Sequence, residues 1–188
     1  MNVLLIEDSA AFAGPIQQEL AARGHDFTWI VGAQRLENGR IVGIRANPSA
    51  DPMGDVWDGD TARFIDIDPT KFDIALCDGG LCGPVNDGVK FVVFLSALNI
   101  PCIAITGGGA GNRRLLDAGA IDGLPKEFVV LALRSGELNL RKIISTHASS
   151  LALQEFCSGL RQQFLQSRNT GNKLSLGYPI LDGLDRCA

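Results

Sequence analysis

Four short runs of apolar residues constrain the fold of this chain more than any other feature. They are Val3–Ile6, Ile74–Cys77, Cys102–Ile105 and the weaker Ile121–Leu124. None of them alternates apolar with polar residues, and each is bounded by residues typical of turns. Continuous apolar runs of this length are typical of strands in a parallel sheet that is covered on both faces.

Helical spacing of apolar residues separates these runs. Phe12, Ile16 and Leu20 recur every fourth residue before Gly24, a residue that often ends a helix, and similar patterns occupy 89–98 and 113–118. Strands that alternate with helices predict a doubly wound α/β sheet.

One stretch breaks the alternation. After a predicted second strand near 27–31, a helix is expected, but the chain carries Asn38-Gly39 and Asp58-Gly59, two dipeptides typical of hairpin turns. Their flanks, Arg40–Arg45 and Ala62–Ile67, have the composition of strands. We therefore predict an antiparallel β insertion over residues 35–68 that takes the place of the second helix.

The C-terminal part is predicted to be helical. Apolar residues in four-three steps indicate one long amphipathic helix within 136–168, with a candidate break at Ser149-Ser150. The apolar stripe of such a helix either packs on the core or forms an interface, with a second copy in a homodimer or with another partner. Residues 169–188 have no period and are expected to be a flexible tail.

Charge and hydropathy limit the partners and the location. A net charge of −4 and a pI near 5.1 argue against direct nucleic-acid binding, which uses a basic face. No apolar run approaches the roughly 18 residues that span a membrane. The N-terminal residues lack the pattern of a signal peptide, so we expect a cytoplasmic protein.

A polar residue follows each apolar run. Glu7 and Asp8 follow the first, Asp78 the second, Thr106 the third and Lys126 the fourth. Parallel strands bring these ends to one edge of the sheet, where ligands bind in open α/β folds. Three carboxylates repel one another unless a cation lies among them, and Mg²⁺ is a hard cation that accepts such ligands. Asp78 could then be a nucleophile toward a phosphoryl group, with Lys126 and Thr106 binding its oxygens.

The motifs LLIEDS, IALCDGGL, AITGG and GLPKEF, in this order, resemble those of response-regulator receiver domains. The resemblance covers about residues 1–135 and implies a flavodoxin-like fold with a five-stranded parallel sheet. It implies that Glu7, Asp8, Asp78 and the Gly80 carbonyl bind Mg²⁺, and that Asp78 accepts phosphate with the help of Thr106 and Lys126. The implied donor is a histidine kinase or phosphotransfer protein, and the implied role is regulatory rather than enzymatic.

The sequence departs from the family at one position that affects signalling. Receiver domains usually carry an aromatic residue three positions before the lysine, and this ring moves inward with the threonine after phosphorylation. Here the position is Gly123. We therefore expect the signal to act through Thr106, Lys126 and the glycine-rich residues that follow Thr106, and output to pass to an unknown downstream protein by contact.

Two other functions fit parts of the pattern. One is a receiver-like interaction module that is never phosphorylated, which Gly123 favours. The other is a phosphatase of the haloacid-dehalogenase type, although Asp78-Gly79-Gly80 lacks the D-x-D signature of that class. A nucleotide-binding loop after Thr106 is disfavoured, because Asn112 stands where G-x-G-x-x-G requires its last glycine.

Overall fold

The computed structural model describes residues 1–38, 40–45, 63–81, 88–107, 109–146 and 151–170. Its central sheet has five parallel strands in the order β2-β1-β6-β7-β8. In chain order these strands are β1 (Asn2–Ile6), β2 (Asp26–Ile30), β6 (Ile74–Cys77), β7 (Cys102–Thr106) and β8 (Asp122–Pro125). Numbered within the sheet alone, this order is 2-1-3-4-5, which is the flavodoxin-like arrangement. The prediction of a flavodoxin-like five-stranded sheet is confirmed.

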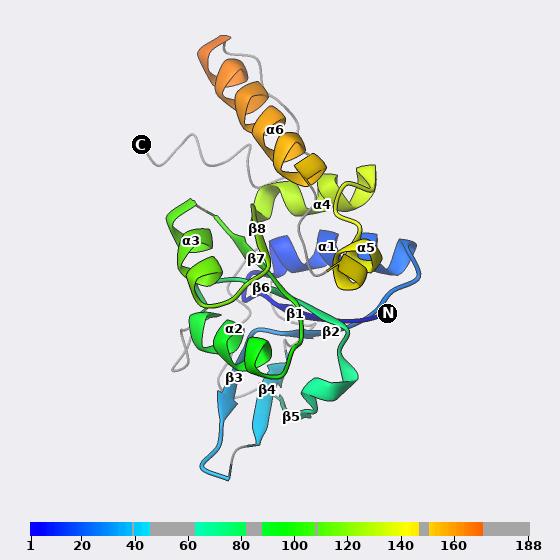
Figure 1. Cartoon of the computed structure of the whole chain (residues 1–188), viewed down its shortest axis with the longest axis vertical. Coiled ribbons are helices and arrows are strands. Elements are labelled where there is room, and N and C mark those ends of the chain that lie inside the picture. Colours follow the sequence, from blue (N-terminus) through cyan, green and yellow to red (C-terminus); the bar gives the residue numbers. More distant parts are fainter. Residues whose placement is uncertain (39, 46–62, 82–87, 108, 147–150, 171–188) are drawn as a thin grey trace.

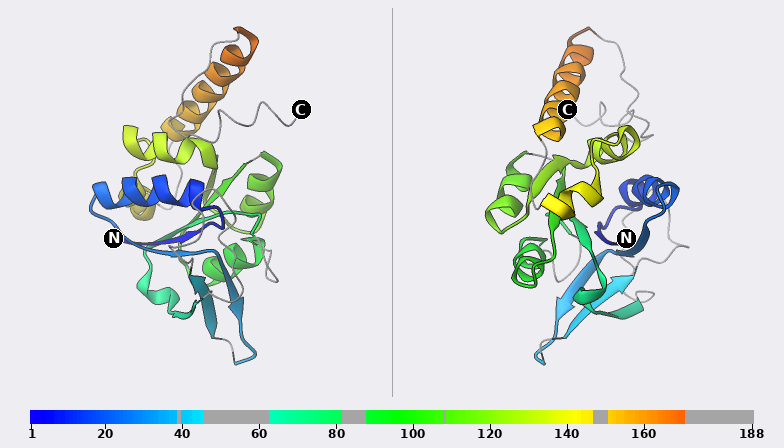
Figure 2. Two further views of the ribbon diagram at one scale, coloured as in Figure 1. Left: turned by 180° about the vertical axis from the view of Figure 1, so that it is seen from behind. Right: turned by 45° about the vertical axis from the view of Figure 1, so that its right-hand side comes forward.

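Helices cover both faces of this sheet (Figures 1 and 2). They are α1 (Ala10–Ala22), α2 (Gly88–Ala97), α3 (Gly109–Asp117), α4 (Lys126–Ser135) and α5 (Leu140–Thr146). The helix α1 ends at a turn in which Gly24 adopts a φ of +67°, a left-handed conformation that glycine reaches without strain. The strand–helix alternation predicted from the apolar runs is therefore present in the described residues.

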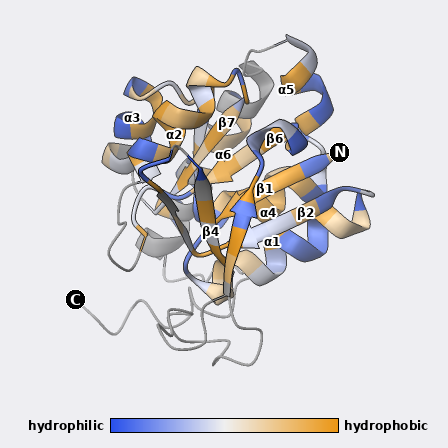
Figure 3. Cartoon of the chain, turned by 90° about the horizontal axis from the view of Figure 1, so that it is seen from below, coloured by the Kyte–Doolittle hydropathy of each residue, from blue (hydrophilic) through white to orange (hydrophobic). Residues whose placement is uncertain are grey.

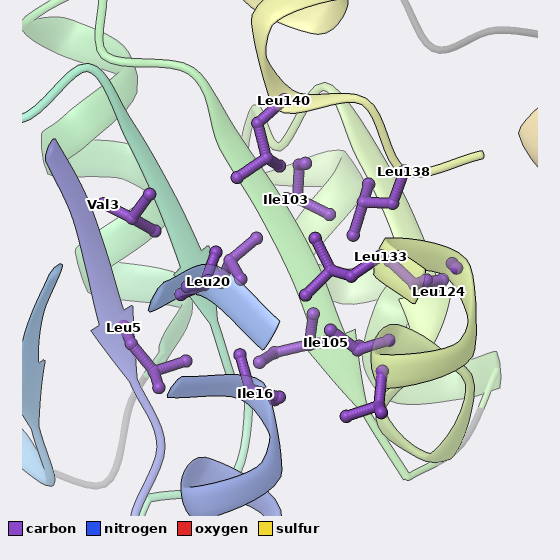
Figure 4. Packing of buried hydrophobic residues seen from close by; sticks show 14 of the residues in the cluster. Val3, Leu5, Ile16, Leu20, Ile103, Ile105, Leu124, Leu133, Leu138 and Leu140 are labelled. Carbon is purple, nitrogen blue, oxygen red and sulfur yellow. The ribbon is translucent and has the colours of Figure 1, made fainter. Parts of the chain in front are cut away.

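Side chains of the strands alternate between two cores. On one face Leu5, Leu76 and Ile105 pack with α1, α4 and α5, and Figure 4 shows part of this cluster. On the other face Ile6, Cys77 and Ala104 pack with α2 and α3. The two-residue period of a strand produces this division, and Figure 3 shows hydrophobic residues along β1 and polar residues on helices such as α1 and α3.

A second, antiparallel sheet stands where the second helix was expected. Its strands are β3 (Gly32–Arg35), β4 (Ile41–Arg45) and β5 (Arg63–Ile67), paired in that order. Side chains from it join the core beneath β1 and β6, among them Ala33 and Ile67. The insertion was predicted to begin at residue 35, but its pairing begins at Gly32, because β2 continues almost directly into β3. The predicted turn at Asp58-Gly59 lies outside the described residues.

The small sheet reaches the main one through a close contact at Gly43. A Cβ atom at this position would lie 2.5 Å from Ile67 Cδ1 and 2.9 Å from Ile30 Cγ2. The absence of a side chain therefore lets β4 pack against the end of β2. Between β5 and β6 the chain makes one 3-10 turn, η1 (Pro69–Lys71).

The C-terminal region contains two helices, α5 and α6 (Leu151–Thr170), where one long helix was predicted. The residues between them, 147–150, include the candidate break and lie outside the described residues, as do residues 171–188 of the expected tail. Phe156, Cys157 and Leu160 of α6 pack against the core, while the rest of α6 projects away from the sheet (Figure 1). Among the described residues, no helix is long and apolar enough to cross a membrane.

Candidate functional site

Strand register brings the predicted site residues together. Ile6 pairs with Cys77 across β1 and β6, so Glu7 and Asp78 leave neighbouring strands at the same level. Thr106 pairs with Pro125 across β7 and β8, so Lys126 follows directly beside the end of β7. The common direction of the strands therefore places all of these residues at one edge of the sheet.

Three carboxylates form the centre of this edge. Oxygen atoms of Glu7, Asp8 and Asp78 lie within 4.8 Å of one another, and all three residues are buried. Glu7 Oε1 accepts a hydrogen bond from the backbone N–H of Ser9, whereas the buried Glu7 Oε2 has no hydrogen bond among the described residues and lies 3.1 Å from Lys126 Nζ as an ion pair. Converging carboxylate oxygens with an unsatisfied acceptor are a donor set that fits a hard divalent cation such as Mg²⁺.

Lys126 lies against two of these carboxylates. Its Nζ atom donates to Asp78 Oδ2 at 2.8 Å and to Glu7 Oε1 at 3.1 Å. Its side chain is only 12% exposed, and the Nζ atom stands 4.8 Å from the centre of the Phe12 ring on α1. The ammonium group thus lies against two carboxyl groups and an aromatic face, which favour its charged form.

The pKa values of Glu7, Asp78 and Lys126 are all raised, as expected for a buried site with an excess of negative charge. Burial raises the pKa of Glu7 to about 8, although Lys126 opposes the shift. Burial also raises the pKa of Asp78 above its usual range, against the opposing effect of Lys126. Burial lowers the pKa of Lys126, but Glu7 and Asp78 outweigh this and raise it overall. One ammonium therefore neutralises the carboxylates only in part, and a bound cation would favour their charged forms.

Backbone groups hold the Asp78 carboxylate in place. The N–H of Gly79 donates to Asp78 Oδ1 at 2.8 Å, and the N–H of Gly80 also bonds to the carboxylate. Gly80 is exposed, and the predicted role of its carbonyl as a metal ligand stays a prediction. At Gly88, where α2 begins, a Cβ atom would lie 2.0 Å from the Asp78 carbonyl oxygen, so this helix packs directly on the backbone of Asp78.

Thr106 lies at the same edge but is held by a different residue. Its backbone N–H and its hydroxyl both donate to Asn112 Oδ1, at 3.1 Å and 3.0 Å. Both residues are buried, with 5% exposure each. The five side chains predicted for the site thus gather at this edge, with Thr106 bonded toward α3.

Three residues of the site were not predicted from the sequence. Asn112 binds Thr106, the ring of Phe12 lies beside Lys126, and Trp29 Nε1 donates to the Glu7 carbonyl at 2.7 Å. Each contacts a site residue through a helix or strand that packs from elsewhere in the chain. A polar Asn on an otherwise core-facing helix position is the only local signal, and it points to Asn112.

Comparisons with known proteins find similarity at the level of structure. No protein-family model matches the chain, and no curated protein does. A response regulator from Thermotoga maritima is similar with a TM-score of 0.50 and 12% identity, over 79% of this chain and 54% of that one.

Two isolated receiver domains are also similar. One belongs to a sensor histidine kinase from Pseudomonas aeruginosa, with Mg²⁺ in its active-site cleft. Its TM-score is 0.48 at 21% identity, over 77% of this chain and 97% of that one. The other, from Leptospira biflexa, has a TM-score of 0.46 at 18% identity, over 77% of this chain and 94% of that one. Together with the strand order, the likeness at a TM-score of 0.50 shows that the chain shares the fold of the Thermotoga maritima response regulator.

Proposed function

We propose that this protein is a phosphorylatable signalling switch that accepts a phosphoryl group on Asp78. The observation that carries the proposal is the geometry of one carboxylate. Asp78 lies within 4.8 Å of two further carboxylates and accepts a hydrogen bond from Lys126 Nζ at 2.8 Å. A nucleophile, a cation-binding cluster and an ammonium group are the parts that phosphoryl transfer requires.

The transfer begins at an oxygen of Asp78. This oxygen attacks the phosphorus of a phosphohistidine on a histidine kinase or phosphotransfer protein. An O–P bond forms while the P–N bond breaks, and its electron pair returns to the imidazole of the donor. Asp78 then carries an acyl phosphate. Backbone N–H groups of Gly79 and Gly80 keep the carboxylate oriented during the approach.

The neighbouring residues stabilise the charge that moves onto Asp78. Lys126 pairs with a phosphoryl oxygen in place of its present contact with Asp78, and the Thr106 hydroxyl donates to another. Glu7, Asp8, Asp78 and the carbonyl of Gly80 would hold Mg²⁺. When bound, this ion would neutralise part of the negative charge on the phosphoryl group.

The wider role follows from this chemistry. The protein would act in the cytoplasm as a regulator, without turnover of a substrate of its own, and pass its state to a downstream protein by contact. The projecting helix α6 has Leu165 60% exposed, which leaves a homodimer through the C-terminal helix as a proposal. The net charge of −4 supports output through protein rather than direct contact with nucleic acid.

Incubation with acetyl phosphate and Mg²⁺, followed by intact mass measurement, tests the proposal. We expect one acid-labile phosphoryl adduct on the wild-type protein and none on Asp78→Asn. Asp73→Asn is the matched control, because Asp73 is exposed and lies just before the opposite end of β6, and it should keep the adduct. An equal yield on Asp78→Asn would contradict the assignment.

The same samples separate the two alternatives. A wild-type protein without adduct, whose Mg²⁺ titration is unaffected by Asp8→Asn, would be the receiver-like module that is never phosphorylated. Steady hydrolysis of a generic phosphate ester would instead indicate a phosphatase of the haloacid-dehalogenase type.

A further inference from the structure

Asn112 is a buried polar residue that the proposed transfer chemistry does not use. It lies in the first half of α3 and is 5% exposed. Its Oδ1 atom accepts both the backbone N–H and the hydroxyl of Thr106. One oxygen that binds two donors of the same residue fixes the position of that residue and the rotamer of its side chain.

The rotamer held by Asn112 turns the Thr106 hydroxyl toward α3. A Cβ atom at Gly111 of this helix would meet Thr106 Oγ1 first, at 2.8 Å. A Cβ atom at Gly79, the neighbour of Asp78, would instead meet the methyl carbon Cγ2 first, at 3.1 Å. The methyl group thus faces the phosphoacceptor side, and the hydroxyl must rotate away from Asn112 to reach an oxygen on Asp78.

Gly123 makes room for this arrangement. A Cβ atom at Gly123 would lie 3.2 Å from Asn112 Cβ and 3.3 Å from its Cγ, the carbon that carries the amide. A larger side chain on β8 would therefore compete with Asn112 for space. Because Gly123 has no side chain, the side chain of Asn112 can occupy the space beside β8.

We propose that Asn112 is a positioning residue that holds Thr106 in its unphosphorylated rotamer and competes with the phosphoryl group for the Thr106 hydroxyl. This inference rests on the proposed phosphorylation of Asp78. When the hydroxyl turns to a phosphoryl oxygen, α3 loses one of its hydrogen bonds to the end of β7. The start of α3 is therefore the segment whose contacts change with the signal.

Binding of beryllofluoride with Mg²⁺, a mimic of the phosphoryl group, tests the competition in the full chain. Asn112→Ala removes the competing acceptor, so we expect it to bind the mimic about three- to tenfold more tightly, the effect of one hydrogen bond. Thr106→Val removes the hydroxyl and keeps the shape. When Asn112→Ala is added to Thr106→Val, the affinity should not change further. Arg113→Ala, on the exposed side of α3, is the control and should bind like the wild type.

The outcomes distinguish the possible failures. Unchanged or weaker binding by Asn112→Ala overturns the inference, and so does an equal gain in the presence of Thr106→Val, because a purely structural role of Asn112 would not require the hydroxyl. If the wild-type protein does not bind the mimic, the proposed function fails and the inference fails with it. Circular dichroism at the titration temperature shows whether each variant is folded, so that a loss of stability is not taken for weaker binding.

Discussion

Two of the ion pairs between a basic side chain and an aspartate lie beside the two sheets, one at each. Lys126 and Asp78 at the edge of the parallel sheet are 12% and 5% exposed. Arg40 and Asp66 on the antiparallel sheet are 58% and 63% exposed. Both pairs join a cation to a carboxylate, but of the two only the Lys126–Asp78 pair lies among further carboxylates, so burial and excess charge set the two regions apart.

The two ion pairs differ in how strongly their residues depend on each other, because water reaches one pair and not the other. At the antiparallel sheet, solvent screens both charges, and either side chain can be replaced by water as a partner. At the parallel sheet, Glu7 and Asp78 depend on Lys126 because they have little access to water. The antiparallel sheet is therefore stabilised mainly by packing. The stability of the site at the edge of the parallel sheet depends on its net charge, which a bound ligand can change.

Replacing the basic residue of each pair should give the largest difference in the free energy of unfolding between the two regions. Lys126→Met leaves two buried carboxylates without their cation, and we expect the free energy of unfolding at pH 8 to fall by about 3 kcal/mol or more. Arg40→Gln should leave the unfolding midpoint unchanged. Urea titrations of both variants measure this, and equal losses would remove the distinction between the two regions.

The free energy of unfolding should fall as the pH rises, because Glu7 loses its proton into a site that already has an excess of negative charge. The pKa of Glu7 is about 8 in the folded protein and near 4.5 when unfolded, so the folded state binds more protons between these values. Stability from this group is therefore complete at low pH and is lost as the pH rises toward 8.

Glu7→Gln removes this group, so the decline between pH 5 and pH 8 should shrink by about 3.5 kcal/mol. Denaturant titrations without metal at several pH values give the slope. Parallel curves for variant and wild type would mean that Glu7 does not hold the extra proton.

The packing of the antiparallel sheet should respond to a single methyl group. Gly43→Ala forces Ile30 and Ile67 to move, and overpacking of this kind costs about 1–2 kcal/mol. Gly32→Ala is the matched control, because its Cβ would meet only Ile44 Cδ1, at 3.8 Å. Thermal unfolding of the two variants should show a lower midpoint for Gly43→Ala alone. The phosphoryl yield at Asp78 should stay the same in both.

The parallel sheet and the site at its edge could be predicted because their signals are local. Each apolar run indicates a buried strand, and the polar residue that follows the run lies at the carboxyl end of that strand. The antiparallel insertion was visible from Asn38-Gly39 and its strand-like flanks. Its start at Gly32 was not, because a strand that runs directly into another has no turn residue at the junction.

Contacts between elements could not be predicted. Asn112 reaches Thr106 only because α3 packs so closely on β7 that a Cβ atom at Gly111 would lie 2.8 Å from Thr106 Oγ1. Phe12 reaches Lys126 only because α1 and α4 share one face of the sheet. Such contacts depend on the distance between packed elements, which the order of residues in one segment does not encode.

The position of β1 between β2 and β6 has a consequence for the entropy of the chain. The backbone N–H of Asn2 bonds to Asp73 across 71 positions, so this pairing closes a long loop that contains the whole antiparallel sheet. The closure entropy grows only with the logarithm of loop length, and a doubling adds about 0.6 kcal/mol. Because β3, β4 and β5 pair with near neighbours, they also shorten the free length of that loop. An insertion at this place therefore lengthens the chain between two adjacent strands with little loss of folding free energy.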